Sequence, residues 1–387
     1  MKKSVILSLL FVTASFFAEL YAIPAFARKY NMTCKTCHAP FPRLKEYGEE
    51  FAGNGFILKD KDAPRYFVET GDEELSLIRD LPLAMRLEGY ITYNHEQSKA
   101  SDVYAPHLFK ILSGGSLGGN VSYYLYYILE EGMSGKLEDA YIFFNEVFGT
   151  GLDVSVGQFQ VCDPIAKREL RLSRDDYMML KVKPGQSNIN LAYDRGVMLS
   201  YSLPTETNLF LQVVNGSGIG AAAAFDNFDT DKHKNIFFMA AQDVAGLFTI
   251  GGNIYSGKED LSASGLQTTS SITMAGGNLV TSLGPVDITA LYEYRKDKNS
   301  FLNSLVTDIV TTGGMLEAIY LPNGDDSKWY AGGLFNLIES DDPGAKLKTV
   351  TGFGGYQVRR NVRLTCEYQY DMHHKYGTVA TGFVAAF

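Results

Sequence analysis

The sequence has 387 residues, a mass of 42.7 kDa and a formal net charge of −9 at pH 7. Its 38 glycines, 24 tyrosines and 24 phenylalanines, with only 20% charged residues, suit many β-strands joined by tight turns better than an α/β enzyme. The mean hydropathy of −0.08 excludes a bundle of membrane helices, the negative charge argues against a nucleic-acid-binding protein, and four cysteines are too few for a disulfide scaffold.

The N-terminus, residues 1–22, is predicted to be an export signal. Two lysines precede an apolar core at residues 5–17, and a plausible cleavage site follows Ala22. The apolar core is too short for a comfortable membrane span, and an uncleaved anchor is the alternative. No later run reaches about 18 apolar residues, so no transmembrane helix is expected. The mature chain should begin near Ile23, outside the cytoplasm.

One motif carries chemistry: Cys34-Lys35-Thr36-Cys37-His38. The spacing C-x-x-C-H is the attachment signature of c-type haem. Two thiols three residues apart fall on one side of a helical turn, where they can bond the two vinyl groups along one haem edge. His38 is then held beneath the iron as an axial ligand. The motif therefore predicts one covalent haem c, with thioether bonds from Cys34 and Cys37.

Two other interpretations of the motif are weaker. A thioredoxin-like redox pair normally lies in a βαβ pattern, which is not evident here. A zinc site needs a second half, whereas Cys162 and Cys366 each stand alone in the sequence. Both are expected to be free thiols, and a disulfide between them is the alternative. The distal haem ligand is left unassigned, although four residues are the nearest candidates in sequence: Met32, Met85, His95 and His107.

Residues 23–80 form the predicted cytochrome segment. A helix is expected from Leu44 to Phe51, with Leu44, Tyr47 and Phe51 on one face and Gly53 and Gly55 ending it. That face could cover the haem or belong to ordinary core packing. A unit of this size is only marginally stable by itself, and a covalently bound haem would stabilise it.

Residues 81–387 alternate apolar and polar side chains in segments of about ten, the pattern of a transmembrane β-barrel strand. The apolar face is clearest in four segments: Leu152, Val154 and Val156; Leu191, Tyr193, Val197, Leu199 and Tyr201; Val286, Ile288, Ala290, Tyr292 and Tyr294; Val362, Leu364, Cys366, Tyr368 and Tyr370. Sixteen strands are expected, beginning near residues 82, 104, 119, 136, 150, 190, 206, 233, 245, 268, 284, 312, 327, 346, 359 and 375.

The connections between these strands support a barrel. Long loops near 94–103, 162–189, 217–232, 257–267 and 296–310 alternate with short turns, as in barrels with short periplasmic turns and longer extracellular loops. The chain ends on Phe387, which resembles the recognition signal of outer-membrane barrels. The fold class is therefore mainly β: a transmembrane outer-membrane β-barrel of about 16 strands, preceded by a short helical c-type cytochrome segment. A soluble β-sandwich is the alternative.

The longest predicted loop contains a run of charges. Arg168, Arg171 and Arg174 would share one face of a helix, and Asp175 and Asp176 follow them. They could fold inward to meet haem propionates or to narrow the pore. We expect a solvated loop, which is the usual place of such charge runs.

Taken together, the sequence resembles the fused monohaem cytochrome–porins, outer-membrane proteins known chiefly as iron oxidases of iron-oxidising bacteria. The specific match covers roughly residues 22–56, and over the barrel the likeness is one of architecture. The matching residues are Pro24, Phe26, Ala27 and Arg28, then Cys34, Cys37 and His38, then Pro42, Leu44 and Gly48.

The resemblance implies electron transfer across the outer membrane by one haem held in a porin-like barrel. The expected partners are extracellular Fe(II) or another redox partner, a periplasmic c-type cytochrome or other electron carrier, and outer-membrane lipid. Three alternatives stay open: electron export to an extracellular acceptor, a passive porin with a structural haem plug, and a periplasmic cytochrome with a soluble β-domain. The net charge of −9 is only a modest attraction for a cation such as ferrous ion.

Overall fold

The computed structural model describes residues 25–30, 32–58, 67–68, 71–72, 75, 77–79, 81–95, 101–130, 135–222, 227–229, 231–263, 265–302 and 308–387. The predicted export signal, its cleavage site and Pro24 lie outside these residues.

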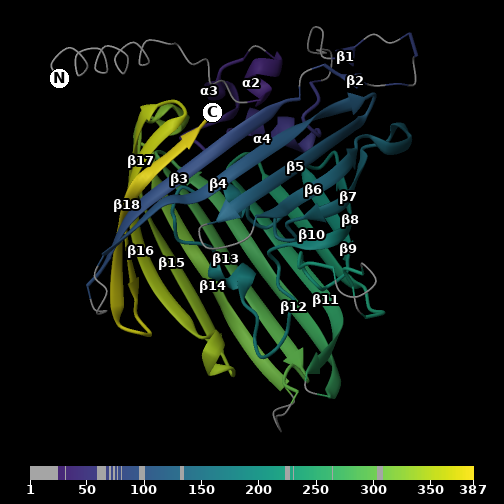
Figure 1. Cartoon of the computed structure of the whole chain (residues 1–387), viewed down its shortest axis with the longest axis vertical. Helices are drawn as coiled ribbons and strands as arrows, with labels where there is room; N and C mark the ends of the chain where they lie inside the picture. Colours follow the sequence, from purple (N-terminus) through teal and green to yellow (C-terminus); the bar gives the residue numbers. More distant parts are fainter. Residues whose placement is uncertain are drawn as a thin grey trace, which may run out of the picture.

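Sixteen of the described strands form one closed antiparallel barrel, in which each strand pairs with its sequence neighbours and the last pairs with the first (Figure 1). The strands are β3 Leu83–Asn94, β4 Ser101–Gly118, β5 Val121–Glu130, β6 Lys136–Phe144, β7 Leu152–Phe159, β8 Asp194–Ser202, β9 Thr207–Val214, β10 Asn235–Val244, β11 Phe248–Ala263, β12 Leu266–Leu283, β13 Val286–Lys298, β14 Asp308–Tyr320, β15 Trp329–Ser340, β16 Leu347–Arg359, β17 Val362–Asp371 and β18 Tyr376–Ala386. The barrel is confirmed, and the alternative β-sandwich is wrong.

The alternation in the sequence becomes the two faces of the barrel wall. On β13, Tyr292 is 59% exposed on the outside, whereas its neighbours Glu293 and Arg295 are 1% exposed and point inward. On β17, Leu364 is exposed and Arg363 is buried in the same way. Successive side chains of a strand point to opposite faces, so one period-two pattern gives an apolar outside and a polar lumen.

All sixteen predicted strand starts lie within four residues of the observed ones. Two details are wrong. The loop expected at 257–267 is mostly strand, because the inward–outward alternation continues to Leu261 and β11 and β12 pair up to Ala263 and Leu266. Leu191 and Tyr193 do not lie on the outer face, because β8 begins only at Asp194 and both side chains are buried before it.

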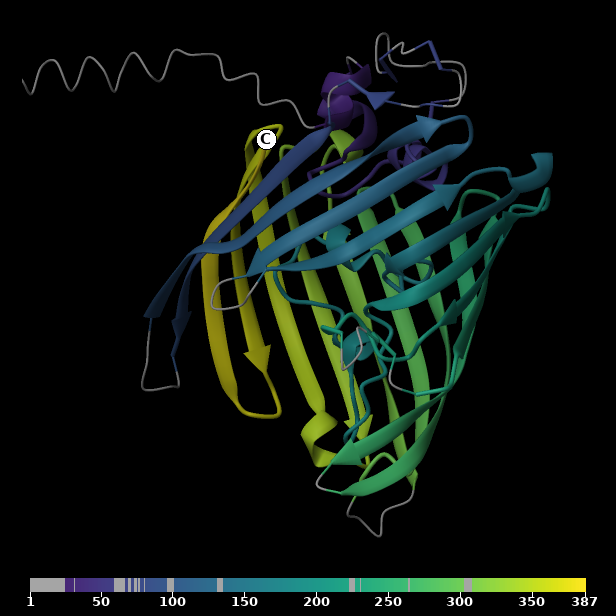
Figure 2. The ribbon, with the colours of Figure 1, turned by 45° about the vertical axis from the view of Figure 1, so that its right-hand side comes forward.

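The two ends of the barrel differ in their connections. One end has mostly short turns, among them 119–120, 203–206, 245–247, 284–285 and 360–361. The other end has the connections 160–193, 215–234 and 299–307. The longest connection, 160–193, folds into the lumen (Figure 2). It contains two short 3-10 helices, η2 Arg168–Leu170 and η3 Met178–Lys181; the others are η1 Val147–Gly149, η5 Gly324–Asp326 and η6 Pro343–Ala345.

In the described part of the chain, three short helices precede the barrel: α2 Ala25–Tyr30, α3 Cys34–Cys37 and α4 Glu46–Gly53. They lie at the same end of the barrel as the C-terminus (Figure 1), followed by the small hairpin of β1 Phe67–Val68 and β2 Leu77–Ile78. The helix expected from Leu44 begins two residues later and ends at Gly53 as predicted. Among the described residues no helix combines the length and apolar character needed to cross a membrane.

The barrel closes where its last strand, β18, pairs with its first strand, β3. β18 pairs with β3 in the register Ala386↔Arg86, and Phe387 and Met85 exchange backbone hydrogen bonds of 2.9 and 2.6 Å. The terminal phenylalanine therefore belongs to the closing strand pair.

Candidate functional site

The helical turn expected for the C-x-x-C-H motif is present as α3. Its last turn is closed by the backbone N–H of His38, which donates to the carbonyl of Cys34 at 2.8 Å. Cys34 and Cys37 are free and partly buried. Burial raises the pKa of both thiols, which argues against a redox pair whose thiolate is stabilised.

His38 is oriented as a ligand needs to be. Its Nδ1 lies 3.2 Å from the carbonyl oxygens of both Pro42 and Arg43, so the proton belongs on Nδ1 and the lone pair on Nε2. Burial lowers the pKa of His38, which favours the neutral ring. A neutral imidazole with one nitrogen anchored to the backbone is the form that ligates a metal.

The residues after the motif hold this turn in place. His38 and Leu44 form an antiparallel bridge, and the N–H of Lys45 donates to the carbonyl of Cys37 at 2.9 Å. Gly48 on α4 packs directly against α3: a Cβ at this position would lie 2.3 Å from the Cys37 carbonyl oxygen. The pattern Pro42, Leu44 and Gly48 thus has a structural reason, since each residue touches the motif.

Substituting Gly48→Ala should therefore disturb the motif. Steric overpacking of this kind costs about 1–3 kcal/mol, and α3 and α4 must separate to relieve it. We expect a several-fold lower content of covalent haem per chain, measured by haem staining after denaturing electrophoresis.

Gly352→Ala is the control, because a Cβ at this exposed position of β16 would meet no atom within 4 Å and Gly352 does not line the cavity beside the motif. It should leave the haem content unchanged. Equal haem contents in the two variants would contradict the packing argument.

A cavity of about 470 Å³ lies beside the motif, within the range of about 300–1,000 Å³ usual for small-molecule sites. Its walls are mainly apolar and aromatic. Phe26 stacks on Phe56 at 4.8 Å between ring centroids, and Phe56 stacks on Tyr124 of β5 at 5.3 Å. From the barrel come further lining residues: Met85, Leu112, Tyr126, Tyr141, Phe143, Met198 and Phe210.

The residues present fit a covalent haem. Cys34, Cys37 and His38 all line the cavity, so the three predicted residues are brought together on one apolar space. Of the expected aromatic face, Leu44 and Phe51 line the cavity, while Tyr47 is 41% exposed and does not.

Of the four candidate distal ligands, two line the cavity beside the motif and two do not. Met32 and Met85 line it, and the sulfur of Met32 lies 3.9 Å from that of Cys37. His107 lines a different cavity, and His95 lies beside Tyr368 near the end of β3. Met198 of β8 also lines the cavity beside the motif. The sequence analysis did not name it as a candidate, because only closure of the barrel brings β8 to the motif.

The charged run in the 160–193 loop is buried, so the expectation of a solvated loop is wrong. Arg168 is 5% exposed and makes two hydrogen bonds to Asp176, Nε to Oδ1 at 3.1 Å and Nη2 to Oδ2 at 2.6 Å. Lys181 also donates to Asp176 at 3.1 Å. Because these charges neutralise one another and the lumen wall is polar, the loop can fold inward.

Polar groups of the wall hold the loop. Tyr177 donates to Glu317 of β14 at 2.9 Å, the backbone N–H of Arg174 donates to Glu367 of β17 at 2.6 Å, and Arg295 of β13 donates to the carbonyl of Ile189 at 2.8 Å. Inward-facing polar residues of several strands therefore serve as anchors for the loop.

One ion pair in the lining of the cavity beside the motif joins the barrel wall to the inward loop. Lys110 of β4, 4% exposed, pairs with Glu169, which also accepts a hydrogen bond from Tyr126 at 3.1 Å. Burial opposes ionisation of Glu169, but the charges of Lys110 and Arg171 outweigh it and lower the pKa of Glu169 to about 2. Glu169 is therefore ionised at neutral pH.

Further ion pairs join the segment predicted to be a cytochrome to the rest of the molecule. Arg43 pairs with Asp287 at 2.5 Å, and Lys35 pairs with Asp326 at 2.8 Å, both at the short-turn end. Glu49 of α4 pairs with Lys167 of the inward loop. Single exposed pairs contribute little, but together they fix the segment over this mouth of the barrel.

Comparison with solved structures shows what this architecture resembles. The anion-selective porin from Comamonas acidovorans matches with a TM-score of 0.58 and 12% identity, covering 80% of this chain and 99% of the porin. OmpF of Salmonella typhi matches with a TM-score of 0.56 and 10% identity, covering 79% of this chain and 97% of OmpF. The barrel has the porin fold. OprB of Pseudomonas putida agrees, with a TM-score of 0.55, 10% identity and coverage of 79% and 94%.

No family model and no curated protein sequence matches this chain. At identities of 10–12%, the structural likeness concerns the fold. The function has to be argued from the site.

Proposed function

We propose that this protein is an outer-membrane barrel that carries one covalent haem c at its short-turn mouth and passes electrons across the membrane. Extracellular Fe(II) is the proposed donor and a periplasmic c-type cytochrome the proposed acceptor. The observation that carries the proposal is the anchored His38 ring, which shares an apolar cavity with both motif cysteines.

The residues of the chain have separate roles in this proposal. Cys34 and Cys37 tether the group and His38 ligates its iron, while Phe26, Phe56 and Tyr124 keep water from one side of the cavity. When bound, haem c supplies a one-electron carrier whose potential depends on axial ligation and burial.

The orientation follows from the connections. Outer-membrane barrels have short turns on the periplasmic side and longer loops outside. The mouth covered by α2, α3 and α4 has the short turns, so it would face the periplasm and a soluble acceptor. The lumen above it would lead toward the outer surface and the donor.

Electron transfer across a sealed bilayer tests the proposal. The holoprotein is inserted into liposomes that contain oxidised cytochrome c, and Fe(II) is added outside. We expect reduction of the enclosed cytochrome. The same liposomes carrying the haem-free Cys34→Ser/Cys37→Ser protein measure leakage of Fe(II), and equal rates in the two preparations would overturn the proposal.

A passive porin with a structural haem plug is the second candidate, favoured by the porin fold of the barrel. It predicts a large, steady conductance in a planar bilayer without redox turnover. Electron export is the remaining alternative. It would appear in the same liposomes as reduction of an external acceptor by an enclosed donor, faster than the Fe(II)-driven reaction.

The proposed cavity also predicts a pH dependence. Burial and the negative charge of Glu169 raise the pKa of Asp163, which lines the cavity, to about 7. Above this pH the carboxylate is ionised and stabilises the oxidised, more positive state. We expect the midpoint potential of the holoprotein to fall as the pH rises through 7, with a slope no steeper than about 59 mV per pH unit.

Asp163→Asn should flatten this slope in a redox titration between pH 5 and pH 9. Asp325→Asn removes an exposed carboxylate from a turn and should leave the slope unchanged. An unaltered slope in Asp163→Asn would rule out this carboxylate as the cause.

A further inference from the structure

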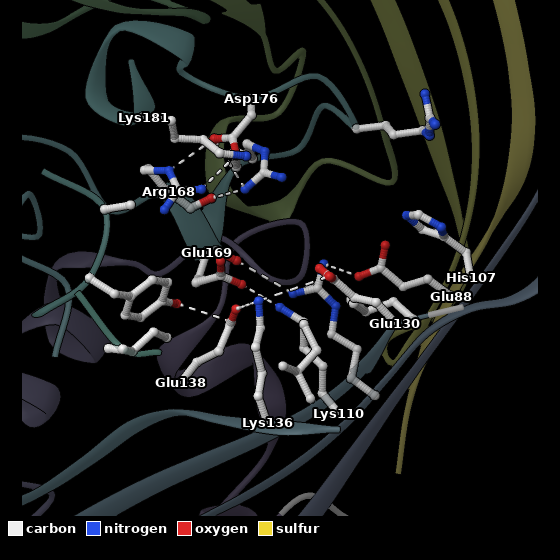
Figure 3. Close-up of a pocket in the computed structure, with 18 of the residues that line it drawn as sticks. Glu88, His107, Lys110, Glu130, Lys136, Glu138, Arg168, Glu169, Asp176 and Lys181 are labelled. Atoms are coloured by element: carbon white, nitrogen blue, oxygen red, sulfur yellow. Dashed lines mark hydrogen bonds and ion pairs between the residues drawn. The ribbon is translucent and has the colours of Figure 1, made fainter. Parts of the chain in front are cut away.

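A second cavity, of about 360 Å³, lies inside the barrel between the 160–193 loop and strands β3–β6 and β17 (Figure 3). Nine lysine and arginine side chains and five aspartate and glutamate side chains line it. The excess of positive charge is opposite in sign to the net charge of −9 on the whole chain.

The carboxylates of this cavity already have partners. Glu88 pairs with Arg86 at 2.5 Å, Glu138 pairs with Lys136 at 3.1 Å, and Glu130 lies 4.0 Å from Lys136. Glu169 and Asp176 are held by Lys110 and by Arg168 with Lys181, respectively, as Figure 3 shows. No lining carboxylate among the described residues is paired with Arg174, Lys183 or Arg363.

Two of these arginines have buried N–H donors without a hydrogen-bond acceptor. Arg363 of β17 is 3% exposed, and its Nε and Nη1 have no hydrogen-bond partner in the described part of the chain; the same holds for Nε of Arg174. Their guanidinium groups lie over the rings of Tyr330 and Tyr90, both at 5.6 Å. The carboxylate beside Arg174, Glu367, already accepts the backbone N–H groups of Arg174 and Asp175.

Buried guanidinium N–H groups without an acceptor are costly, because they lose their hydrogen bonds to water and gain none in exchange. An oxyanion between them would supply the missing acceptors and balance the charge. We infer that this cavity is a binding site for a small oxyanion of the phosphate class, held by Arg174 and Arg363.

Haem propionates have the same carboxylate chemistry and are the other source of an anion. The two cavities share only Arg86, Lys110 and Glu169 as lining residues, whereas Arg174 and Arg363 line the charged cavity alone. Because a haem held by Cys34, Cys37 and His38 would occupy the other cavity, Arg174 and Arg363 are left for a free anion.

Calorimetric titration of the detergent-solubilised holoprotein with inorganic phosphate tests the inference. We expect saturable binding of one phosphate per chain, weakened at least about tenfold in Arg174→Gln/Arg363→Gln. Arg359→Gln removes an exposed arginine at the end of β16 and should bind like the unaltered protein. Arg174→Lys/Arg363→Lys keeps both charges and should bind within a few-fold, provided that far-ultraviolet circular dichroism shows a folded barrel.

Two results would overturn the inference. One is the absence of saturable binding to the holoprotein, or equal binding by the glutamine and unaltered proteins. The other is binding by haem-free Cys34→Ser/Cys37→Ser protein alone, which would assign the cluster to the haem propionates.

Discussion

Replacing Cys34 and Cys37 together with serine should abolish covalent haem while leaving the barrel folded. The two thiols are the only residues of the motif that can form thioether bonds, and they lie on α3, outside the strand pairing of the barrel. We expect no haem stain after denaturing electrophoresis and an unchanged β-sheet signal in circular dichroism. Reduction of enclosed cytochrome c by Fe(II) should fall to the leakage rate.

Cys366→Ser is the matched control for this experiment. The same atom is removed, but Cys366 is exposed on the outer face of β17, far from the motif in sequence. This variant should keep its full haem content. Covalent haem in the double variant, or its loss in Cys366→Ser, would contradict the assignment.

Removing the charge of Asp176 should open the lumen. Although burial opposes its ionisation, Arg171 and Arg168 hold the pKa of Asp176 well below its usual range, so Asp176→Asn leaves buried cations without their carboxylate. Breaking a buried pair in this way costs about 3–5 kcal/mol. We expect the inward loop to detach from the wall, which should raise single-channel conductance several-fold in a planar bilayer.

Asp308→Asn provides the comparison, because it also removes one carboxylate from an ion pair. Asp308 pairs with Lys296 at 2.8 Å, but both side chains are exposed, and water replaces the lost interaction. Its conductance should equal that of the unaltered protein. Should Asp176→Asn also leave the conductance unchanged, the loop does not depend on this ion pair.

The strands could be predicted from the sequence because each follows a local rule. An outward Tyr292 next to an inward Glu293 is visible in the residues themselves, and lipid outside with polar lumen inside makes the pattern strict. The rule failed at 257–267, where small and polar residues suggested a loop. There, pairing between β11 and β12 continues, and cross-strand hydrogen bonds decide the structure more than composition does.

The fate of the 160–193 loop could not be predicted in the same way. Arg168 and Asp176 have the composition of a solvated loop, and only the acceptors and donors of distant strands make an inward position favourable. The partners Glu317 and Glu367 come from β14 and β17, far along the chain. Such contacts depend on closure of the barrel, which no local pattern encodes.

The candidate site, too, could be predicted from the sequence only in part. Cys34, Cys37 and His38 were identified by their spacing, and the anchoring of His38 by Pro42 depends on neighbours within a few residues. The far wall of the cavity, with Tyr124, Met198 and Phe210, comes from strands scattered over the barrel. A motif thus indicates which group is expected, whereas the space around it follows from the fold.

The pairing of β18 with β3 closes the barrel and also forms part of the wall of the candidate site. Met85 of β3 and Ala386 of β18, on opposite sides of that pairing, also line the cavity beside the motif. These residues are about as distant in sequence as the barrel allows, and pairings of such long range form late because the entropy of loop closure opposes them. We therefore expect the cavity wall to be completed only when the barrel closes, and loss of the final residues to damage the lining of the site as well as the closure of the barrel.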